Sequence, residues 1–118
     1  MSYKYKFLKS GCKLITIPRS DSRTTHIAFF VKVGSRDEVE GEFGMAHFLE
    51  HMLFKGNRSL KTQLRITNNL DTMGSEYNAY TTKNMTCYHI SVASKYATRA
   101  FTTYSNMLLH STLKQKEM

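Results

Sequence analysis

Residues 45–54 read Met-Ala-His-Phe-Leu-Glu-His-Met-Leu-Phe, and this stretch decides how the rest of the chain is interpreted. At about 100° per residue on a helix, His47, Glu50 and His51 point in nearly the same direction. The apolar side chains that cover the opposite side are Met45, Phe48, Leu49, Met52 and Leu53. The pattern therefore predicts an amphipathic helix with its apolar side in the core and two imidazoles and a carboxylate on the other face.

The three polar residues of this helix have the spacing of a metal site. Two histidines at positions i and i+4 can both reach one metal ion across a helical turn. Glu50 lies one turn from His47 and beside His51, so its carboxylate can reach a water on the same metal and act as a general base. The residue frequencies of this chain give about 0.01 chance occurrences of the triplet. A metal site is therefore favoured over three unrelated polar residues on a solvated face.

The segments before this helix have the patterns of strands. Cys12–Ile17 is β-branched and ends at a proline, and Thr24–Val33 places its apolar residues on alternate positions. The helix itself is predicted from Phe43 to Lys55 and ends at Gly56. Carboxylates between residues 37 and 42 suit its N-terminus, because the helix dipole favours negative charge there.

The segments after this helix alternate again between helix and strand. A second helix is predicted from Leu60 to Met73, with Ser59 as its N-cap and Gly74 as its end. Further on, the prediction has two antiparallel strands, Glu76–Thr82 and Asn84–Ala93, and a third helix that Ser94 caps and that ends near Ser111. Residues 112–118 are expected to form a turn and the start of another helix. The order ββααββα indicates an α+β fold with helices on one face of a mostly antiparallel sheet.

Composition excludes several other classes of protein. A chain of 118 residues with 41% hydrophobic residues suits one domain with a core of its own. No apolar run approaches the roughly 20 residues that cross a bilayer, and the first ten residues are too short for a leader. Cys12 and Cys87 form no metal spacing and are expected to be reduced thiols. The compartment is not specified by the sequence, although the cytoplasm is favoured.

The net charge of +8 has no clear functional meaning in this chain. Its lysines and arginines are spread from Lys4 to Lys116 without a run of four. The aromatic residues have core spacing and do not alternate with arginines as in a stacking platform. We therefore expect no nucleic-acid or membrane partner.

The sequence resembles a known family at several positions. His47-Phe-Leu-Glu-His51 is the inverted form of the zinc-peptidase motif, H-x-x-E-H. Together with Val31–Glu38 before it, Gly44–Gly56 around it and Asn78-Ala-Tyr-Thr81 after it, the motif resembles the pitrilysin (insulinase-type) zinc metallopeptidases. It is most similar to the subfamily that contains the mitochondrial processing peptidase β-subunit and its bacterial relatives. The resemblance runs from about Leu8 to the last residue and covers the opening quarter or so of a family member.

The resemblance implies a cofactor, a reaction and a mode of substrate binding. Zn²⁺ would be the cofactor, with His47 and His51 as its ligands. Glu50 would be the catalytic base that activates the zinc-bound water for attack on a peptide carbonyl. A peptide or protein substrate would pair in an extended form with the edge of the strand after the second helix. The substrate-binding residues of that strand would be Asn78, Ala79 and Tyr80.

The resemblance also implies that part of the site lies elsewhere. A catalytic zinc has three protein ligands and a water, and the third ligand in the family is a Glu near position 126 in this numbering. Residues 1–118 are therefore expected to be a single partial N-terminal metallopeptidase domain, without the third ligand and the second domain. Glu76 could approach the metal but has no ligand position in the family, and Glu117 comes about nine residues too early. The remaining histidines, expected to be core or surface residues, are His26, His89 and His110.

Three functions stay open at this point. The first is a zinc-dependent endopeptidase whose missing ligand and domain come from a second chain. The second is a truncated or split-gene remnant that binds metal weakly or not at all and serves at most as an interaction module. The third, less favoured, is a basic nucleic-acid or membrane-surface binder. An unpaired sheet edge and an exposed apolar helix face are expected, and both promote association.

Overall fold

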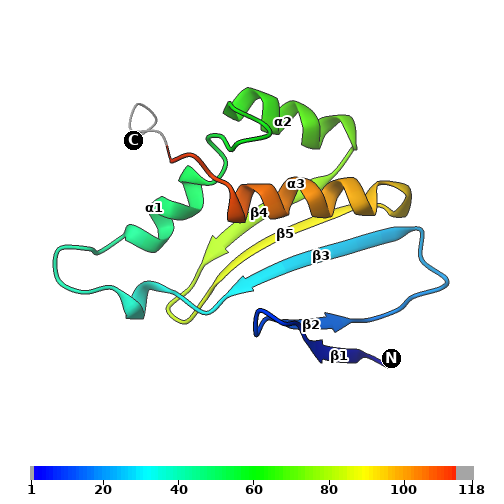
Figure 1. The fold of residues 1–118 in the computed structure, drawn as a ribbon, viewed down its shortest axis with the longest axis horizontal. Coiled ribbons are helices and arrows are strands. Elements are labelled where there is room, and N and C mark those ends of the chain that lie inside the picture. The colour runs from blue at the N-terminus through cyan, green and yellow to red at the C-terminus, as the bar shows by residue number, and fades with distance from the viewer. Residues whose placement is uncertain (1, 114–118) are drawn as a thin grey trace.

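The computed structural model describes residues 2–113 and is drawn as a ribbon in Figure 1. Its strands and α-helices are β1 (Lys4–Phe7), β2 (Lys13–Thr16), β3 (Thr24–Val31), α1 (Met45–Met52), α2 (Gln63–Thr72), β4 (Glu76–Thr81), β5 (Thr86–Ala93) and α3 (Ala97–Leu109). From β2 onward the predicted order ββααββα is confirmed, and with it the α+β class. The start of a further helix that was predicted for the chain's end falls on residues 114–118, outside the described residues.

Two antiparallel sheets make up the strand part of the fold. The larger sheet has the strand order β3-β5-β4, with Ile90 of β5 opposite Ile27 on one side and Tyr77 on the other. The hairpin of β1 and β2 is a separate two-stranded sheet. In Figure 1 the helices lie on one side of the larger sheet and the hairpin lies beyond β3. Strand β4 is therefore an edge strand of the sheet, next to α1.

The core lies between the larger sheet and helices α2 and α3. Alternate residues of β5 face these helices and are buried; they are Tyr88, Ile90 and Val92. From the helices, the buried residues of this cluster are Ile66, Leu70, Ala100, Tyr104 and Met107. The hydroxyl of Tyr104 donates a hydrogen bond of 2.7 Å to the carbonyl of His89, so the central strand and α3 are joined by a polar contact as well as by packing.

Strand β1 was not predicted from the sequence. It pairs with β2 through a turn at Gly11, whose φ of 90° is in the left-handed region that favours glycine. The ammonium of Lys13 lies 4.7 Å from the ring centroid of Tyr5, a cation–π contact across the hairpin. The alternation of aromatic residues and lysines over residues 3–7 is a period-two signal that indicates this strand.

Two predicted helix starts were wrong, and local hydrogen bonds explain both. Asn57 accepts hydrogen bonds through Oδ1 from the backbone N–H groups of Ser59 and Leu60, which keeps this segment in a turn. Helix α2 therefore begins at Gln63, capped by the Thr62 hydroxyl instead of Ser59. Ser94 does not cap α3 either. It starts a 3-10 helix over Ser94–Tyr96, and its hydroxyl bonds to that of Thr25 at 2.9 Å.

Helix α1 begins without a capping side chain of its own. Its N-cap is Gly44, with a φ of 88°, and the carboxylate of Glu38 takes over the capping role from six residues upstream. That carboxylate accepts hydrogen bonds from the N–H groups of Gly44 (2.8 Å) and Ala46 (2.9 Å). Of the acidic residues that were predicted to stabilise this N-terminus, Glu38 is the one that bonds to it. Its carboxylate accepts from N–H groups that have no partner within the helix and complements the helix dipole.

Several large apolar side chains are exposed. Those with at least half of their surface exposed include Tyr3, Tyr5, Phe7, Ile15, Ile17, Phe30, Val39, Phe43, Met45, Leu64, Phe101 and Leu109. Many of them lie on the β1–β2 hairpin, at the end of β3 and before α1. Both cysteines are free thiols, with Cys12 exposed and Cys87 buried. Within residues 2–113, no helix is both long and apolar enough to span a membrane.

Replacing Glu38 by Ala tests the cap of α1. The change leaves the N–H groups of Gly44 and Ala46 without their acceptor, and we expect it to lower the free energy of unfolding by about 1 kcal/mol. Urea unfolding followed by circular dichroism measures this loss. Glu40, an exposed carboxylate of the same loop, provides the matched control, since Glu40→Ala should change the unfolding free energy far less. Equal losses in the two variants would contradict the capping role.

Alkaline pH tests the buried phenols of the core. Burial raises the pKa of Tyr104 well above the ordinary value near 10, and burial and then the charge of Glu50 raise the pKa of Tyr88 to about 12. As the pH rises, the unfolded chain loses the phenol protons of these tyrosines before the folded chain does. The contribution of the two neutral phenols to the free energy of unfolding is therefore complete below pH 10 and is lost as the pH rises from 10 toward 12.

We therefore expect the melting temperature to fall between pH 10 and pH 12. Tyr104→Phe should cost about 1 kcal/mol at pH 7, because the carbonyl of His89 loses its hydrogen bond. Above pH 10 the melting temperature of this variant should fall less steeply than that of the wild type. Parallel profiles would show that Tyr104 does not contribute to the alkaline transition.

Candidate metal centre

His47 and His51 lie together on the exposed side of α1, as the sequence predicted. Their Nε2 atoms are 2.9 Å apart, and the ring centroids are separated by 4.6 Å with the planes at 73°. The two nitrogens that the i, i+4 spacing was expected to bring together thus face a common point. The two nitrogens lie at hydrogen-bond distance from each other, and a pair this close could also reach one metal ion.

Glu50 lies beside the imidazole pair but is not solvated. Only 7% of its surface is exposed, and its Oε2 atom lies 3.9 Å from Nδ1 of His47. The same oxygen accepts a hydrogen bond of 2.6 Å from the hydroxyl of Thr81 on β4. The carboxylate is therefore buried with a hydrogen-bond donor, which offsets part of the cost of burying it.

The burial of Glu50 corrects the predicted orientation of α1. The prediction placed the carboxylate on the face away from the core and all five apolar residues in the core. Met52 and Leu53 are indeed buried, but Met45, Phe48 and Leu49 are 52%, 40% and 43% exposed. The reason is that α1 packs against β4 with the side that carries Glu50, so part of the apolar stripe faces outward.

The buried carboxylate lies near two other ionisable groups. Burial and the negative charge of Glu50 raise the pKa of Tyr88 to about 12, so this phenol stays protonated at neutral pH. The carboxylate also lies near His47, with Oε2 3.9 Å from Nδ1, which is beyond hydrogen-bond distance.

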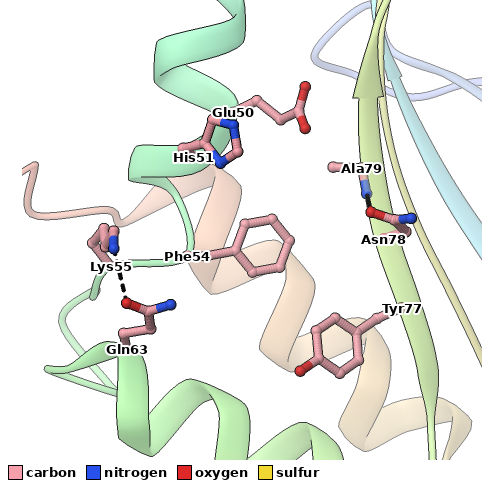
Figure 2. A pocket seen from close by; sticks show the side chains of 8 residues that line it. All are labelled: Glu50, His51, Phe54, Lys55, Gln63, Tyr77, Asn78 and Ala79. Atoms are coloured by element: carbon pink, nitrogen blue, oxygen red, sulfur yellow. Dashed lines mark hydrogen bonds between the residues drawn. The ribbon is translucent and has the colours of Figure 1, made fainter.

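A cavity of about 260 Å³ opens beside this helix, between α1, the start of α2 and β4. Its lining residues, shown in Figure 2, are Glu50, His51, Phe54, Lys55, Gln63, Tyr77, Asn78 and Ala79. The rings of Phe54 and Tyr77 stack at 6.3 Å, and Lys55 Nζ donates to Gln63 Oε1 at 2.9 Å. The cavity thus has an aromatic wall and a polar wall, and the candidate base lies at its edge.

The structure separates the three residues that were predicted to bind substrate. Asn78 and Ala79 line the cavity, and the N–H of Ala79 donates to Oδ1 of Asn78 at 2.8 Å. The side chains of Asn78 and Tyr80 alternate with that of Ala79 and lie on the other face of the sheet, where the ring centroid of Tyr80 is 6.0 Å from that of His89. Sequence reasoning missed the two aromatic residues of the wall. The signal for Phe54 was its position one turn after His51, on the side of the buried Leu53.

A close backbone contact fixes where the loop before α1 leaves the sheet. A Cβ atom on Gly34 would lie 2.3 Å from the carbonyl oxygen of Thr82, so a glycine is required here by space. The N–H groups of Ser35 and Arg36 donate to the carbonyls of Thr82 and Lys83, each at 3.0 Å. These bonds hold the loop that carries Glu38 against the turn after β4. Because Glu38 caps α1, they also help to fix the position of α1 next to β4, the strand that contacts Glu50.

The number of metal donors in the described part of the chain is limited. No group of three or more His, Cys, Asp or Glu residues within residues 2–113 is placed to hold a metal. By their chemistry the two imidazoles suit two of the three protein ligands of a catalytic zinc, and Glu50 lies beside them. His26 instead bonds through Nδ1 to the hydroxyl of Ser91 at 2.8 Å. Glu117, which was weighed as a ligand, lies outside the described residues.

Comparison with known proteins identifies the family of this chain. A sequence model of the family described as Insulinase (Peptidase family M16) matches residues 14–118. The chain belongs to the M16 peptidase family. The fold of this M16 chain is also that of a solved structure, "The crystal structure of a protease from Helicobacter pylori", with a TM-score of 0.92 and 28% identity. That match covers 98% of this chain and 28% of the other.

Similar proteins are named as proteases or peptidases. The "Uncharacterized zinc protease YmxG" of Bacillus subtilis is 34% identical over 110 residues, which are 93% of this chain and 27% of that protein. The human "Mitochondrial-processing peptidase subunit beta" is 35% identical over 111 residues, 94% of this chain and 22% of that protein. This M16 chain therefore spans about a quarter of the length of these relatives.

Proposed function

We propose that this chain carries the metal-binding helix and the catalytic base of a zinc-dependent endopeptidase. In this proposal His47 and His51 are zinc ligands and Glu50 is the general base. One observation carries it: two imidazole nitrogens lie 2.9 Å apart beside a buried carboxylate in an M16 chain. The names of the relatives as zinc proteases support Zn²⁺ as the metal.

The chemistry would divide between the metal and the side chains around it. A bound zinc ion would lower the pKa of its water and polarise the peptide carbonyl. Glu50 would take the proton of the attacking water and pass it to the leaving amine nitrogen. His47 would bind the ion through Nε2, while its Nδ1 lies 3.9 Å from the Glu50 carboxylate.

The edge of β4 would hold the substrate. In the described part of the chain, β4 pairs with β5 on one side, and its other side lies next to α1. An extended peptide could pair with that edge through backbone hydrogen bonds. The cavity beside Asn78 and Ala79, with the stacked rings of Phe54 and Tyr77, would then accept one apolar or aromatic side chain of the peptide.

Residues outside this chain would complete the site. The imidazole pair provides two ligands, and a catalytic zinc has three. We propose that the third ligand and an opposing domain come from further polypeptide, either a partner chain or a longer form of this one. The human relative is itself named as a subunit, which fits a peptidase made from more than one chain.

A second candidate function follows from the same donor count. With two imidazoles as the metal donors among residues 2–113, the chain could be an inactive remnant that binds metal weakly and acts as an interaction module. The exposed apolar residues of the β1–β2 hairpin favour contact with another polypeptide. Metal binding and turnover distinguish the two functions.

Zinc binding is the first test. We expect the purified chain to bind Zn²⁺ in isothermal titration calorimetry and a His47→Ala/His51→Ala double variant to bind none. The matched control is His26→Ala/His89→Ala, which removes the other neighbouring histidine pair, with ring centroids 5.7 Å apart. That control should keep the zinc stoichiometry of the wild type. Unchanged zinc binding in the His47/His51 variant would refute the assignment of the ligands.

Turnover is the second test. We expect the isolated 118-residue chain with saturating Zn²⁺ to show little cleavage of an unstructured fluorogenic peptide, because two protein ligands hold the metal weakly. The control is Glu50→Gln, which should lie at the same background rate. Zinc-dependent cleavage that is lost in Glu50→Gln would show that the chain needs no third ligand from elsewhere.

A further inference from the structure

We propose that Thr81 is a positioning residue of the metal centre: its hydroxyl fixes the Glu50 carboxylate against the imidazole pair and ties it to the substrate strand. This inference rests on the proposed function and assigns a role that the motif itself does not contain. It is carried by the hydrogen bond of 2.6 Å from Thr81 Oγ1 to Glu50 Oε2 and by the burial of that carboxylate.

The hydrogen bond selects one oxygen of the carboxylate. Oε2 accepts from Thr81 and is also the atom that lies 3.9 Å from Nδ1 of His47. Holding Oε2 between these two groups fixes the rotation of the carboxylate, and Oε1 is then the oxygen left to accept a proton. Figure 2 shows the carboxylate of Glu50 directed from α1 toward β4, in agreement with this arrangement.

The strand end that carries Thr81 is itself fixed. Thr81 lies opposite Thr86 in the register of β4 and β5, and the hydroxyl of Thr86 donates to the carbonyl of Val33 at 2.9 Å. The next residue, Thr82, accepts from the loop before α1 through its carbonyl. Because both neighbours are bonded, the Thr81 hydroxyl is presented from a rigid position.

Because Glu50 is buried, loss of the Thr81 hydrogen bond should change the position of its carboxylate. A carboxylate with 7% of its surface exposed has little water to replace a lost hydrogen bond. Without the hydroxyl, the side chain of Glu50 would turn away toward solvent, and the carboxylate would no longer be held beside the imidazole pair. Thr81 also stands three residues after Asn78 on β4, so a peptide paired with this strand and the base would belong to one rigid unit.

Three variants of the full chain test this role, with metal binding as the readout. Thr81→Val keeps the shape and removes the hydroxyl, and we expect it to bind Zn²⁺ about 10-fold more weakly. Thr81→Ser keeps the hydroxyl and should bind as the wild type does. Thr103→Val removes another buried threonine hydrogen bond, the one to Oδ1 of Asn69 between α3 and α2, and should lower the melting temperature without changing zinc affinity. Normal zinc affinity in Thr81→Val, with a lowered melting temperature, would reduce Thr81 to a structural role and overturn the proposal.

A double-mutant cycle shows whether Thr81 acts through Glu50. In the Glu50→Gln background we expect Thr81→Val to have no further effect on zinc affinity or on the visible spectrum of the Co²⁺-loaded chain. This background also removes the buried charge, so it protects the measurement if Thr81→Val alone folds poorly. Additive effects would overturn the proposal. A wild-type chain that binds neither Zn²⁺ nor Co²⁺ would overturn the proposed function together with this role, whereas wild-type binding with additive effects overturns this role alone.

Discussion

The buried carboxylate of Glu50 is the constraint on which the arrangement of this protein depends. A charge that is 93% covered must be hydrogen-bonded, and the Thr81 hydroxyl on β4 is the donor that the structure provides. Meeting this requirement turns one side of α1 toward the sheet. It leaves the two imidazoles exposed on the flank of the helix, and it sends Phe48 and Leu49 outward, where a purely hydrophobic account would have buried them.

The position of α1 is set at its N-terminus as well as by Glu50. The helix has eight residues and no capping side chain of its own, so it depends on Glu38 for its first hydrogen bonds. Glu38 in turn follows a loop that Gly34 allows to approach Thr82 without a side chain between them. Two separate contacts therefore hold α1 near the same end of β4. One is made by the loop before the helix with Thr82, and the other by Glu50 with Thr81. An imidazole pair on a helix held in this way keeps its geometry relative to the strand edge.

Local pattern was enough to predict the elements and the partners within one helix. The i, i+4 spacing predicted that His47 and His51 come together, and the alternation in β5 predicted its buried side. The prediction failed where a contact joins distant segments. The helix periodicity does not reveal that the hydroxyl of a threonine 31 residues away donates a hydrogen bond to the buried carboxylate of Glu50. The turn that Asn57 makes with the following backbone likewise displaced the start of α2, because a side-chain acceptor outcompeted the weak helix preference of that segment.

The difference between contacts within one helix and contacts between distant segments also explains which parts of the site are preorganised. Glu50, the proposed base, and β4, the proposed substrate strand, are joined by a hydrogen bond between two elements of the described chain. The proposed metal would depend on two exposed imidazoles, and the side chain of His47 is 64% exposed. Two ligands in water hold zinc more weakly than three in a closed site, because the open positions are filled by solvent and the ligands retain rotamer freedom. We infer that zinc affinity, rather than the geometry of the base, is the property that additional polypeptide would change in this member of the M16 family.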